Sequence, residues 1–229
     1  MSIRIRSREA TLTVHSPDDT GPLLAVSELA RSFGDVVALR PVSLTVGRGE
    51  AVVLTGPNGS GKTTLLRCVA GADRPSGGTV LLSGRPLHEH EAESRRLIAA
   101  VLDDIDFFAD LTITEHLALL MCAHGVAEPD SRAADLLAEA GLSAVAGHRP
   151  AALSSGQRRR LALITCFARP RAIVLMDEPE QRLDRAGRRW LAGRLAAEKD
   201  LGHGVLIATH DRRLADSLAD RIINLGGSR

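Results

Sequence analysis

Short apolar runs separated by turns fill the first part of the chain beyond residue 22. The runs are rich in leucine and valine, and glycine or proline residues lie between them, which is typical of strands. They cover Leu24–Leu29, Val42–Val46, Ala51–Thr55 and Thr79–Leu82. We predict an antiparallel β lobe that leads into one buried strand, Ala51–Thr55. After Gly61 the spacing of apolar residues becomes helical.

Helical spacing dominates the middle of the chain. Between Leu111 and Leu142 apolar residues recur three or four positions apart, and Pro129 marks the start of a second helix. This pattern predicts a helical subdomain over about residues 111–153. Three short apolar runs follow, each joined to the next by a helical stretch: Ala172–Met176, Gly204–Ala208 and Arg221–Leu225. Such alternation predicts a mostly parallel sheet covered by helices, and therefore an α/β fold.

The first 22 residues differ from the rest of the chain. They end in a run of Ser, Pro, Asp, Thr and Gly, and they contain one apolar alternation, over residues 3–14. We expect an N-terminal tail over residues 1–22, with an edge strand at residues 3–14 as the partly ordered alternative. A single domain is expected over residues 23–229.

Composition excludes several classes of protein. The 229 residues carry 29 Lys and Arg against 28 Asp and Glu, and 44% of them are hydrophobic, as in an ordinary globular domain. The net charge of +1 gives no basic surface, so no nucleic-acid partner is expected. No stretch approaches the roughly 20 apolar residues that span a bilayer, and the N-terminus lacks a continuous apolar signal core. We therefore expect no membrane span and no secretion by a signal peptide.

Cysteine and lysine usage adds two expectations. Cys68, Cys122 and Cys166 are odd in number and lie among aliphatic residues, so a reducing cytosol is expected rather than a disulfide framework. Lysine occurs only at positions 62 and 199, and all other basic residues are arginine. Because arginine occupies every other basic position, we expect each of the two lysines to have a chemical role that is specific to lysine.

The strongest chemical signal follows the buried strand Ala51–Thr55. The segment fits the pattern G-x-x-x-x-G-K-[ST] between a strand and a helix, and it consists of Gly56, Pro57, Asn58, Gly59, Ser60, Gly61, Lys62, Thr63 and Thr64. Its glycines let successive backbone N–H groups surround phosphate oxygens, Lys62 faces the β and γ phosphates, and Thr63 holds Mg²⁺. The alternative is an ordinary glycine-rich turn. The context favours the core of a P-loop NTPase.

A second signal is an apolar strand that ends in two carboxylates. Asp177 and Glu178 follow Ala172–Met176, and parallel strands place such residues at the edge where the phosphate loop lies. We expect Asp177 to reach Mg²⁺ through water and Glu178 to orient and deprotonate the attacking water. Without the phosphate loop, an acidic pair after a strand is usually a turn or a helix cap.

A third signal identifies the subclass. Leu153-Ser154-Ser155-Gly156-Gln157 begins a helix upstream of the acidic strand, and here the sequence resembles the ATP-binding cassette (ABC) ATPase family, whose signature is LSGGQ. The resemblance runs from Leu23 to the C-terminus. It implies that Ser154, Ser155, Gly156 and Gln157 bind the nucleotide held by the opposite subunit. A plain helix N-cap is the alternative for these residues.

The resemblance also assigns roles to single residues outside these motifs. His210, after the run Gly204–Ala208, is similar to the family's switch histidine, which contacts the γ-phosphate and the catalytic Glu. Phe33 lies where the family stacks an aromatic ring on adenine. Asp103 occupies the place of a family Gln that senses Mg²⁺ and the membrane partner, so it joins Thr63 and Asp177 as an expected metal ligand.

Two segments depart from the family pattern. The loop that begins at Asp103 is acidic throughout, which indicates either a solvated charge run or a surface for a basic helix of a membrane subunit. After the catalytic Glu, the residues Glu180, Gln181 and Arg182 replace small or neutral ones. In the signature, Ser155 replaces a glycine, and Gly156 keeps the close approach.

The resemblance implies an α/β P-loop NTPase core with an antiparallel β lobe and a helical subdomain. We expect an ATP-hydrolysing subunit of an ABC transporter, more similar to bacterial exporters than to sugar importers. Lys62, Glu178 and His210 are the expected catalytic residues, ATP and Mg²⁺ the cofactors, and a membrane-spanning subunit and a second ATP-binding subunit the partners. Such a subunit works in the cytoplasm, on the inner face of the cell membrane. The alternatives are a soluble ABC ATPase of cofactor assembly and a cassette that binds ATP without turnover.

Overall fold

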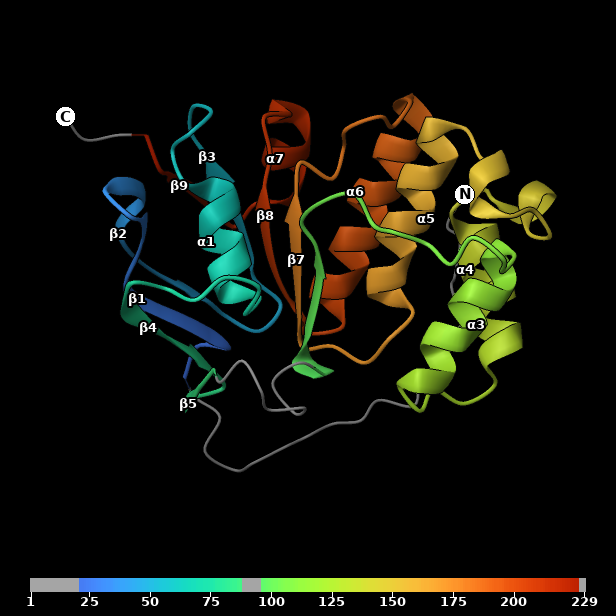
Figure 1. The fold of residues 1–229 in the computed structure, drawn as a ribbon, viewed down its shortest axis with the longest axis horizontal. Helices are drawn as coiled ribbons and strands as arrows, with labels where there is room; N and C mark the ends of the chain where they lie inside the picture. Colours follow the sequence, from blue (N-terminus) through green and yellow to red (C-terminus); the bar gives the residue numbers. More distant parts are fainter. Residues whose placement is uncertain (1–20, 88–95, 227–229) are drawn as a thin grey trace.

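The computed structural model describes residues 21–87 and 96–226. Their strands form two sheets, one antiparallel and one parallel, with helices between and beside them (Figure 1). This arrangement confirms the predicted α/β class with an antiparallel β lobe. Residues 3–14, considered above for an edge strand, lie outside the described residues.

The antiparallel sheet has four strands in the order β2-β1-β4-β5. The strands are β1 (Leu24–Phe33), β2 (Val36–Val46), β4 (Gly77–Leu82) and β5 (Arg85–Pro86). β1 and β2 form a hairpin in which Phe33 pairs with Val36 across a turn, and Gly34 in that turn has φ +56°. The glycine fits because residues with a side chain rarely adopt a positive φ. Both hairpin strands extend beyond the predicted apolar runs.

The parallel sheet has five strands in the order β6-β7-β8-β3-β9. The strands are β3 (Ala51–Thr55), β6 (Ile98–Val101), β7 (Ile173–Asp177), β8 (Gly204–Ala208) and β9 (Arg221–Asn224). Every pair of neighbours is parallel, as predicted. The analysis of the sequence missed β6, a four-residue strand of which two residues are alanine, the strongest helix former.

Each face of the parallel sheet has its own apolar core. Val52 and Leu54 of β3 point into a core shared with the antiparallel sheet and with α1 (Lys62–Val69). Ala51 and Val53 point to the opposite side, into a core shared with the remaining helices. Because both faces are covered, the central strands are apolar along their whole length, which is why they appear as continuous runs in the sequence.

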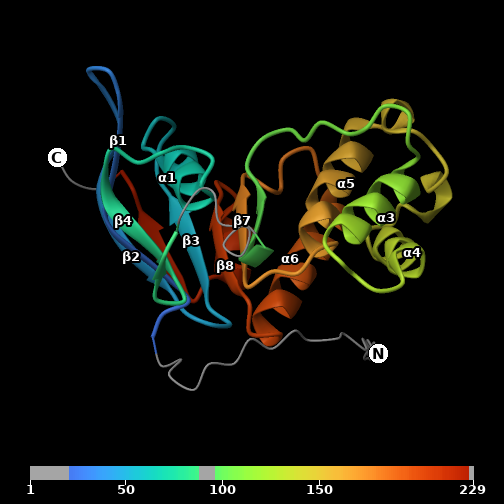
Figure 2. The ribbon, with the colours of Figure 1, turned by 60° about the horizontal axis from the view of Figure 1, so that its bottom comes forward.

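The helices on the second face form two layers (Figures 1 and 2). The helices α5 and α6 lie beside the sheet, α7 contacts α6, and α3 and α4 lie beyond α5. Their bounds are α3 Ile113–Ala123, α4 Pro129–Glu139, α5 Ser155–Phe167, α6 Arg185–Asp200 and α7 Arg212–Leu218. The stretch 111–153 thus contains α3, α4 and two 3₁₀ turns. Within residues 21–87 and 96–226, no helix has the length and apolar character needed to cross a membrane.

A buried charge network fixes α6 against the end of α5. Glu198 is fully buried, and its carboxylate accepts hydrogen bonds from Arg171 Nε and Nη2 (both 2.6 Å) and from Arg194 Nη2 (2.7 Å). His203 Nδ1 lies 2.7 Å from the same carboxylate. Burial alone would raise the pKa of Glu198, but the hydrogen bonds from His203 and Arg171 outweigh it and hold the pKa at about 2.

We expect Glu198→Gln to lower the free energy of unfolding by about 3–5 kcal/mol, because it leaves buried guanidinium groups without their counter-charge. Urea denaturation measures the effect. The matched control is Glu139→Gln, whose partly exposed carboxylate lies 3.4 Å from Arg194 and which should cost at most about 1 kcal/mol. Equal losses in the two variants would show that the network contributes no more than a surface ion pair.

Candidate functional site

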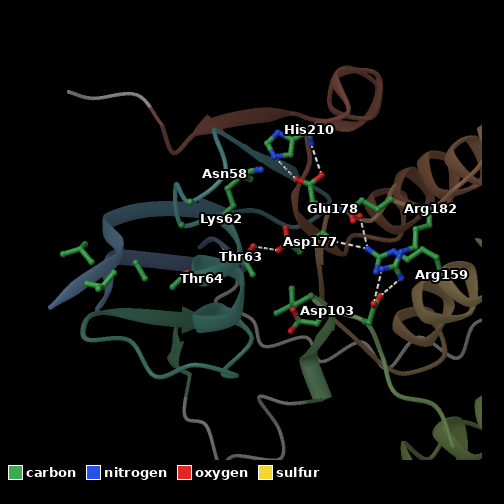
Figure 3. A pocket seen from close by; sticks show the side chains of 18 residues that line it. Asn58, Lys62, Thr63, Thr64, Asp103, Arg159, Asp177, Glu178, Arg182 and His210 are labelled. Carbon is green, nitrogen blue, oxygen red and sulfur yellow. Dashed lines mark hydrogen bonds and ion pairs between the residues drawn. The ribbon is translucent and has the colours of Figure 1, made fainter. Parts of the chain in front are cut away.

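The predicted phosphate loop joins β3 to α1 at the carboxyl edge of the parallel sheet (Figure 3). Gly61 has φ +96°, and a Cβ there would lie 2.9 Å from the carbonyl oxygen of Ala38, so only glycine fits. The Lys62 side chain is buried, and its ammonium donates to the carbonyls of Gly56 (2.8 Å) and Pro57 (3.2 Å). The loop therefore concentrates a positive charge and the N-terminus of α1 at one point.

Asp177 lies directly beside this loop. It ends β7, two strands away from β3, and its carboxylate accepts a hydrogen bond from the Thr63 hydroxyl, drawn as a dashed line in Figure 3. Burial raises the pKa of Asp177 above its ordinary value. The structure thus brings together two of the three predicted metal ligands as a pair of oxygen donors.

Glu178 and His210 meet on the other side of Asp177. The Nε2 atom of His210 lies 3.1 Å from Glu178 Oε1, and the backbone N–H of His210 donates to Glu178 Oε2 at 3.2 Å. Glu178 adopts φ +43°, which residues other than glycine rarely do. Burial raises the pKa of Glu178 to about 7, and the neighbouring carboxylate of Glu180 adds to the rise.

Glu180 is a buried second carboxylate that the sequence analysis recorded only as a departure from the family. It is 5% exposed and accepts a hydrogen bond from the hydroxyl of Thr209, which is itself buried. Its negative charge adds to the effect of burial and disfavours the ionised form of the neighbouring Glu178. The carboxyl end of β7 is therefore more acidic in composition than the predicted pair of residues alone.

These groups surround one pocket of about 790 Å³. The predicted residues that line it are Asn58, Gly59, Gly61, Lys62, Thr63, Thr64, Asp103, Asp177, Glu178 and His210. The predicted residues Gly56, Pro57 and Ser60 belong to the same loop but do not line the pocket. Residues from β2, β3, β7, β8 and their loops thus converge on a single cavity, as the two motifs predicted.

Asp103 lines the pocket, but its carboxylate binds another partner. Its Oδ2 atom lies 2.6 Å from Nη1 of Arg67, which also binds Asp73. The next residue, Asp104, forms a bidentate ion pair with Arg182, in which Nη1 lies 2.9 Å from Oδ1 and Nη2 lies 3.2 Å from Oδ2. Each of the two acids is therefore paired with an arginine, and metal binding by Asp103 stays a prediction.

Phe33 lies next to the pocket and is absent from its lining. Its ring is half exposed, and the guanidinium of Arg31 lies 4.2 Å from the ring centroid. The same hairpin contributes Val36 and Val37 to the lining, although both side chains are more than half exposed. Stacking of adenine on Phe33 stays a prediction, and the two valines are apolar contacts that the sequence analysis did not select.

The signature residues are also absent from the lining of this pocket. They begin α5 as a capping box, in which Gln157 N–H donates to Ser154 Oγ (3.3 Å) and Ser154 N–H donates to Gln157 Oε1 (2.9 Å). The N-cap alternative is therefore realised in the isolated chain. Ser155 and Gly156 do not line the pocket of their own chain. Their predicted binding to a nucleotide held by the opposite subunit therefore stays a proposal.

Two lining arginines were not selected from the sequence. Arg159 is buried on α5 and donates to the backbone carbonyls of Asp177 and Glu178. Arg182, half exposed, contributes the ion pair with Asp104. The run of three arginines at 158–160 does not single out Arg159, because helical spacing directs one of three consecutive residues to a given neighbour without telling which one.

Comparison with known proteins agrees with this geometry. A family model described as ABC transporter matches residues 39–181. The chain is 34% identical over 231 residues to the methionine import ATP-binding protein MetN of Brucella abortus, covering 96% of this chain and 62% of that protein. It is 36% identical over 213 residues to the spermidine/putrescine import ATP-binding protein PotA of Pseudomonas aeruginosa, covering 92% and 58%.

A solved structure shares the fold as well. It is a dimeric post-hydrolysis state of the ATP-binding cassette MJ0796 bound to ADP and Pi, with a TM-score of 0.79, 28% identity, and coverage of 89% of this chain and 94% of that one. The family model spans more than half of the chain and includes the phosphate loop and both carboxylates. The chain therefore belongs to the ABC transporter family, in which it is an ATP-binding cassette.

Proposed function

We propose that this chain hydrolyses MgATP and thereby powers an ABC transporter whose membrane-spanning subunits are separate chains. One observation carries the proposal: Lys62, the Thr63–Asp177 pair and the Glu178–His210 pair all face one pocket. The chain spans about three fifths of the length of the curated relatives it matches. ATP hydrolysis is thus inferred from the chain's own site, and the role in a transporter from the names of these relatives.

The residues beside the phosphate loop fit a magnesium ion. Thr63 and Asp177 offer a hydroxyl and a carboxylate oxygen that already approach each other, and Mg²⁺ prefers oxygen ligands. A cation beside Asp177 would also favour the charged form of this buried carboxylate. When bound with ATP, Mg²⁺ supplies positive charge at the phosphate oxygens. Lys62 and the N–H groups of the loop hold the same phosphates from the opposite side.

Glu178 is the group best placed to accept a proton from water. Its carboxylate is partly buried and held by both the ring and the backbone N–H of His210, so its direction is fixed. A water molecule beside it would lose one proton to Glu178 while its oxygen attacks the γ-phosphorus, and ADP departs as the bond to the β-phosphate oxygen breaks. His210 then contacts the γ-phosphate and Glu178 together.

A second cassette would complete the site. Ser154, Ser155, Gly156 and Gln157 lie at the start of α5, outside the pocket of their own chain, with the first two exposed and the other two partly buried. The similar cassette MJ0796 is described as a dimer. We propose a head-to-tail dimer, of two copies or of this chain with a related one, in which the α5 N-terminus of each subunit faces the phosphates held by the other.

The second expected partner is a membrane-spanning subunit. MetN and PotA are both named as ATP-binding proteins of import systems, which favours transport over the soluble cofactor-assembly alternative. Export, which the sequence analysis favoured, has no support from these relatives, and the proposal covers transport in either direction. The chain would work at the cytoplasmic face of the cell membrane. A basic helix that contacts the acidic loop from Asp103 would compete there with Arg67 and Arg182, which already bind Asp103 and Asp104.

We expect Glu178→Gln to retain ATP binding and to hydrolyse ATP about 10²- to 10⁴-fold more slowly, because it removes the proton acceptor without changing shape. Phosphate release measures turnover, and light scattering should show ATP-bound dimers accumulating. The control Glu139→Gln, far from the pocket, should keep wild-type turnover. Unchanged turnover in Glu178→Gln would remove this residue from the mechanism.

We expect Lys62→Ala to abolish measurable ATP binding in calorimetry, since it deletes the charge that faces the β and γ phosphates. The melting temperature of the nucleotide-free protein should change little. The only other lysine offers the control: Lys199→Ala breaks an ion pair with Asp220 outside the pocket and should leave ATP affinity at the wild-type level. Equal ATP affinity in the two variants would contradict the phosphate-loop assignment.

A further inference from the structure

Arg159 is a buried cation at the catalytic end of β7. It is 8% exposed, whereas its neighbour Arg158 on the same helix is exposed. Figure 3 shows its guanidinium pointing from α5 toward Asp177 and Glu178. One nitrogen, Nη2, donates to the carbonyl oxygens of both residues, at 3.0 and 2.9 Å. The contact is therefore with the backbone that carries the two catalytic carboxylates.

This backbone turns in an unusual way. Glu178 adopts φ +43°, a region that side-chain-bearing residues rarely occupy and that persists only where the surroundings fix it. Its N–H donates to the carbonyl of Ala208 at 2.9 Å, which ties the turn to β8. Its carbonyl is fixed by Arg159 from the side of α5. The direction of the Glu178 side chain toward His210 thus depends on hydrogen bonds to the N–H and to the carbonyl of this residue, one on each side of its Cα.

The charge of Arg159 is held in place by the acids around it. Asp104, Glu180 and Asp177 act on the guanidinium as negative charges, while burial lowers its pKa below the ordinary value. An arginine stays protonated in such surroundings. The hydrogen bonds from Arg159 Nη2 to the carbonyls of Asp177 and Glu178 fix the buried guanidinium on the turn.

We propose that Arg159 is a positioning residue for ATP hydrolysis, which fixes the turn at Glu178 so that its carboxylate points at the attacking water. The inference rests on the proposed function. Arg159 lies on the helix that begins at Ser154, so it also connects the helix start that would face the opposite nucleotide with the catalytic turn of its own chain. Arg159 lies outside the motifs identified in the sequence.

The test compares hydrolysis and binding in Arg159→Met, which keeps the length of the side chain and removes its charge and donors. We expect kcat to fall by about 10- to 100-fold, the cost of a misplaced catalytic group, while ATP affinity by calorimetry stays at the wild-type level. The matched control is Arg158→Met on the exposed face of α5, which should keep wild-type kcat. Wild-type kcat in folded Arg159→Met would overturn the inference.

A double-mutant cycle separates positioning from a general structural role. If Arg159 acts through Glu178, then Arg159→Met should lower the residual turnover of Glu178→Gln very little, because residues that act as a unit are not additive. Additive losses in the double variant would overturn the inference. Arg159→Lys, which keeps the charge and loses the planar fork, should have a kcat between those of wild type and Arg159→Met.

A failure of the Arg159 variants to fold and a failure of the proposed function give different results. If Arg159→Met does not fold, Arg159→Lys carries the test: lower kcat at unchanged ATP affinity supports positioning, and wild-type kcat overturns it. If the wild-type dimer itself releases no phosphate from MgATP, the proposed function fails first, and positioning for hydrolysis fails with it. Hydrolysis by the wild type together with unaffected Arg159 variants contradicts the positioning role alone.

Discussion

The parallel pairing of β3, β8 and β7 is the constraint on which the whole site depends. Leu54 lies opposite Ala208, and Ala208 lies opposite Asp177, so the three strands end at the same level. The phosphate loop, His210 and the Asp177–Glu178 pair follow these three ends directly. Since parallel strands cannot be joined by tight turns, the connections between them are long and include helices that cover both faces of the sheet. The same topology therefore buries the strands and gathers the reactive groups at one edge.

Charge compensation is the second condition for this site. The pocket at the end of β7 is lined by four carboxylates, those of Asp103, Asp104, Asp177 and Glu178. The cations that line it come from different elements: Lys62 from α1, Arg159 from α5 and Arg182 from the loop before α6. Burying such charges without partners would be costly. Burial raises the pKa of Glu178 to about 7, and the carboxylate of Glu180 adds to the rise. A base whose pKa lies near neutral is well matched to proton transfer at physiological pH.

Local patterns in the sequence predicted the central strands and the phosphate loop because both are contiguous. A buried parallel strand is a run of apolar residues, and the loop requires glycines and Lys62 at fixed spacing. The contacts of Asp103 with Arg67 and of Arg159 with β7 join distant segments, so no spacing rule reveals them. Glu180 was visible only as an unusual residue, since nothing in the sequence shows that it is buried beside Glu178. The four-residue strand β6 was missed because its two alanines suit a helix equally well.

The central claim is that Glu178 of one subunit and the signature of the other act on the same nucleotide, and complementation between two inactive variants tests it most directly. Ser155 is exposed at the start of α5, and Ser155→Glu suits a helix N-terminus while it repels phosphate. Each of Ser155→Glu and Glu178→Gln should be nearly inactive alone. In an equal mixture, half of the dimers are mixed and each has one intact composite site, so about a quarter of wild-type turnover should return. A mixture no more active than its separate components would contradict a site shared between subunits.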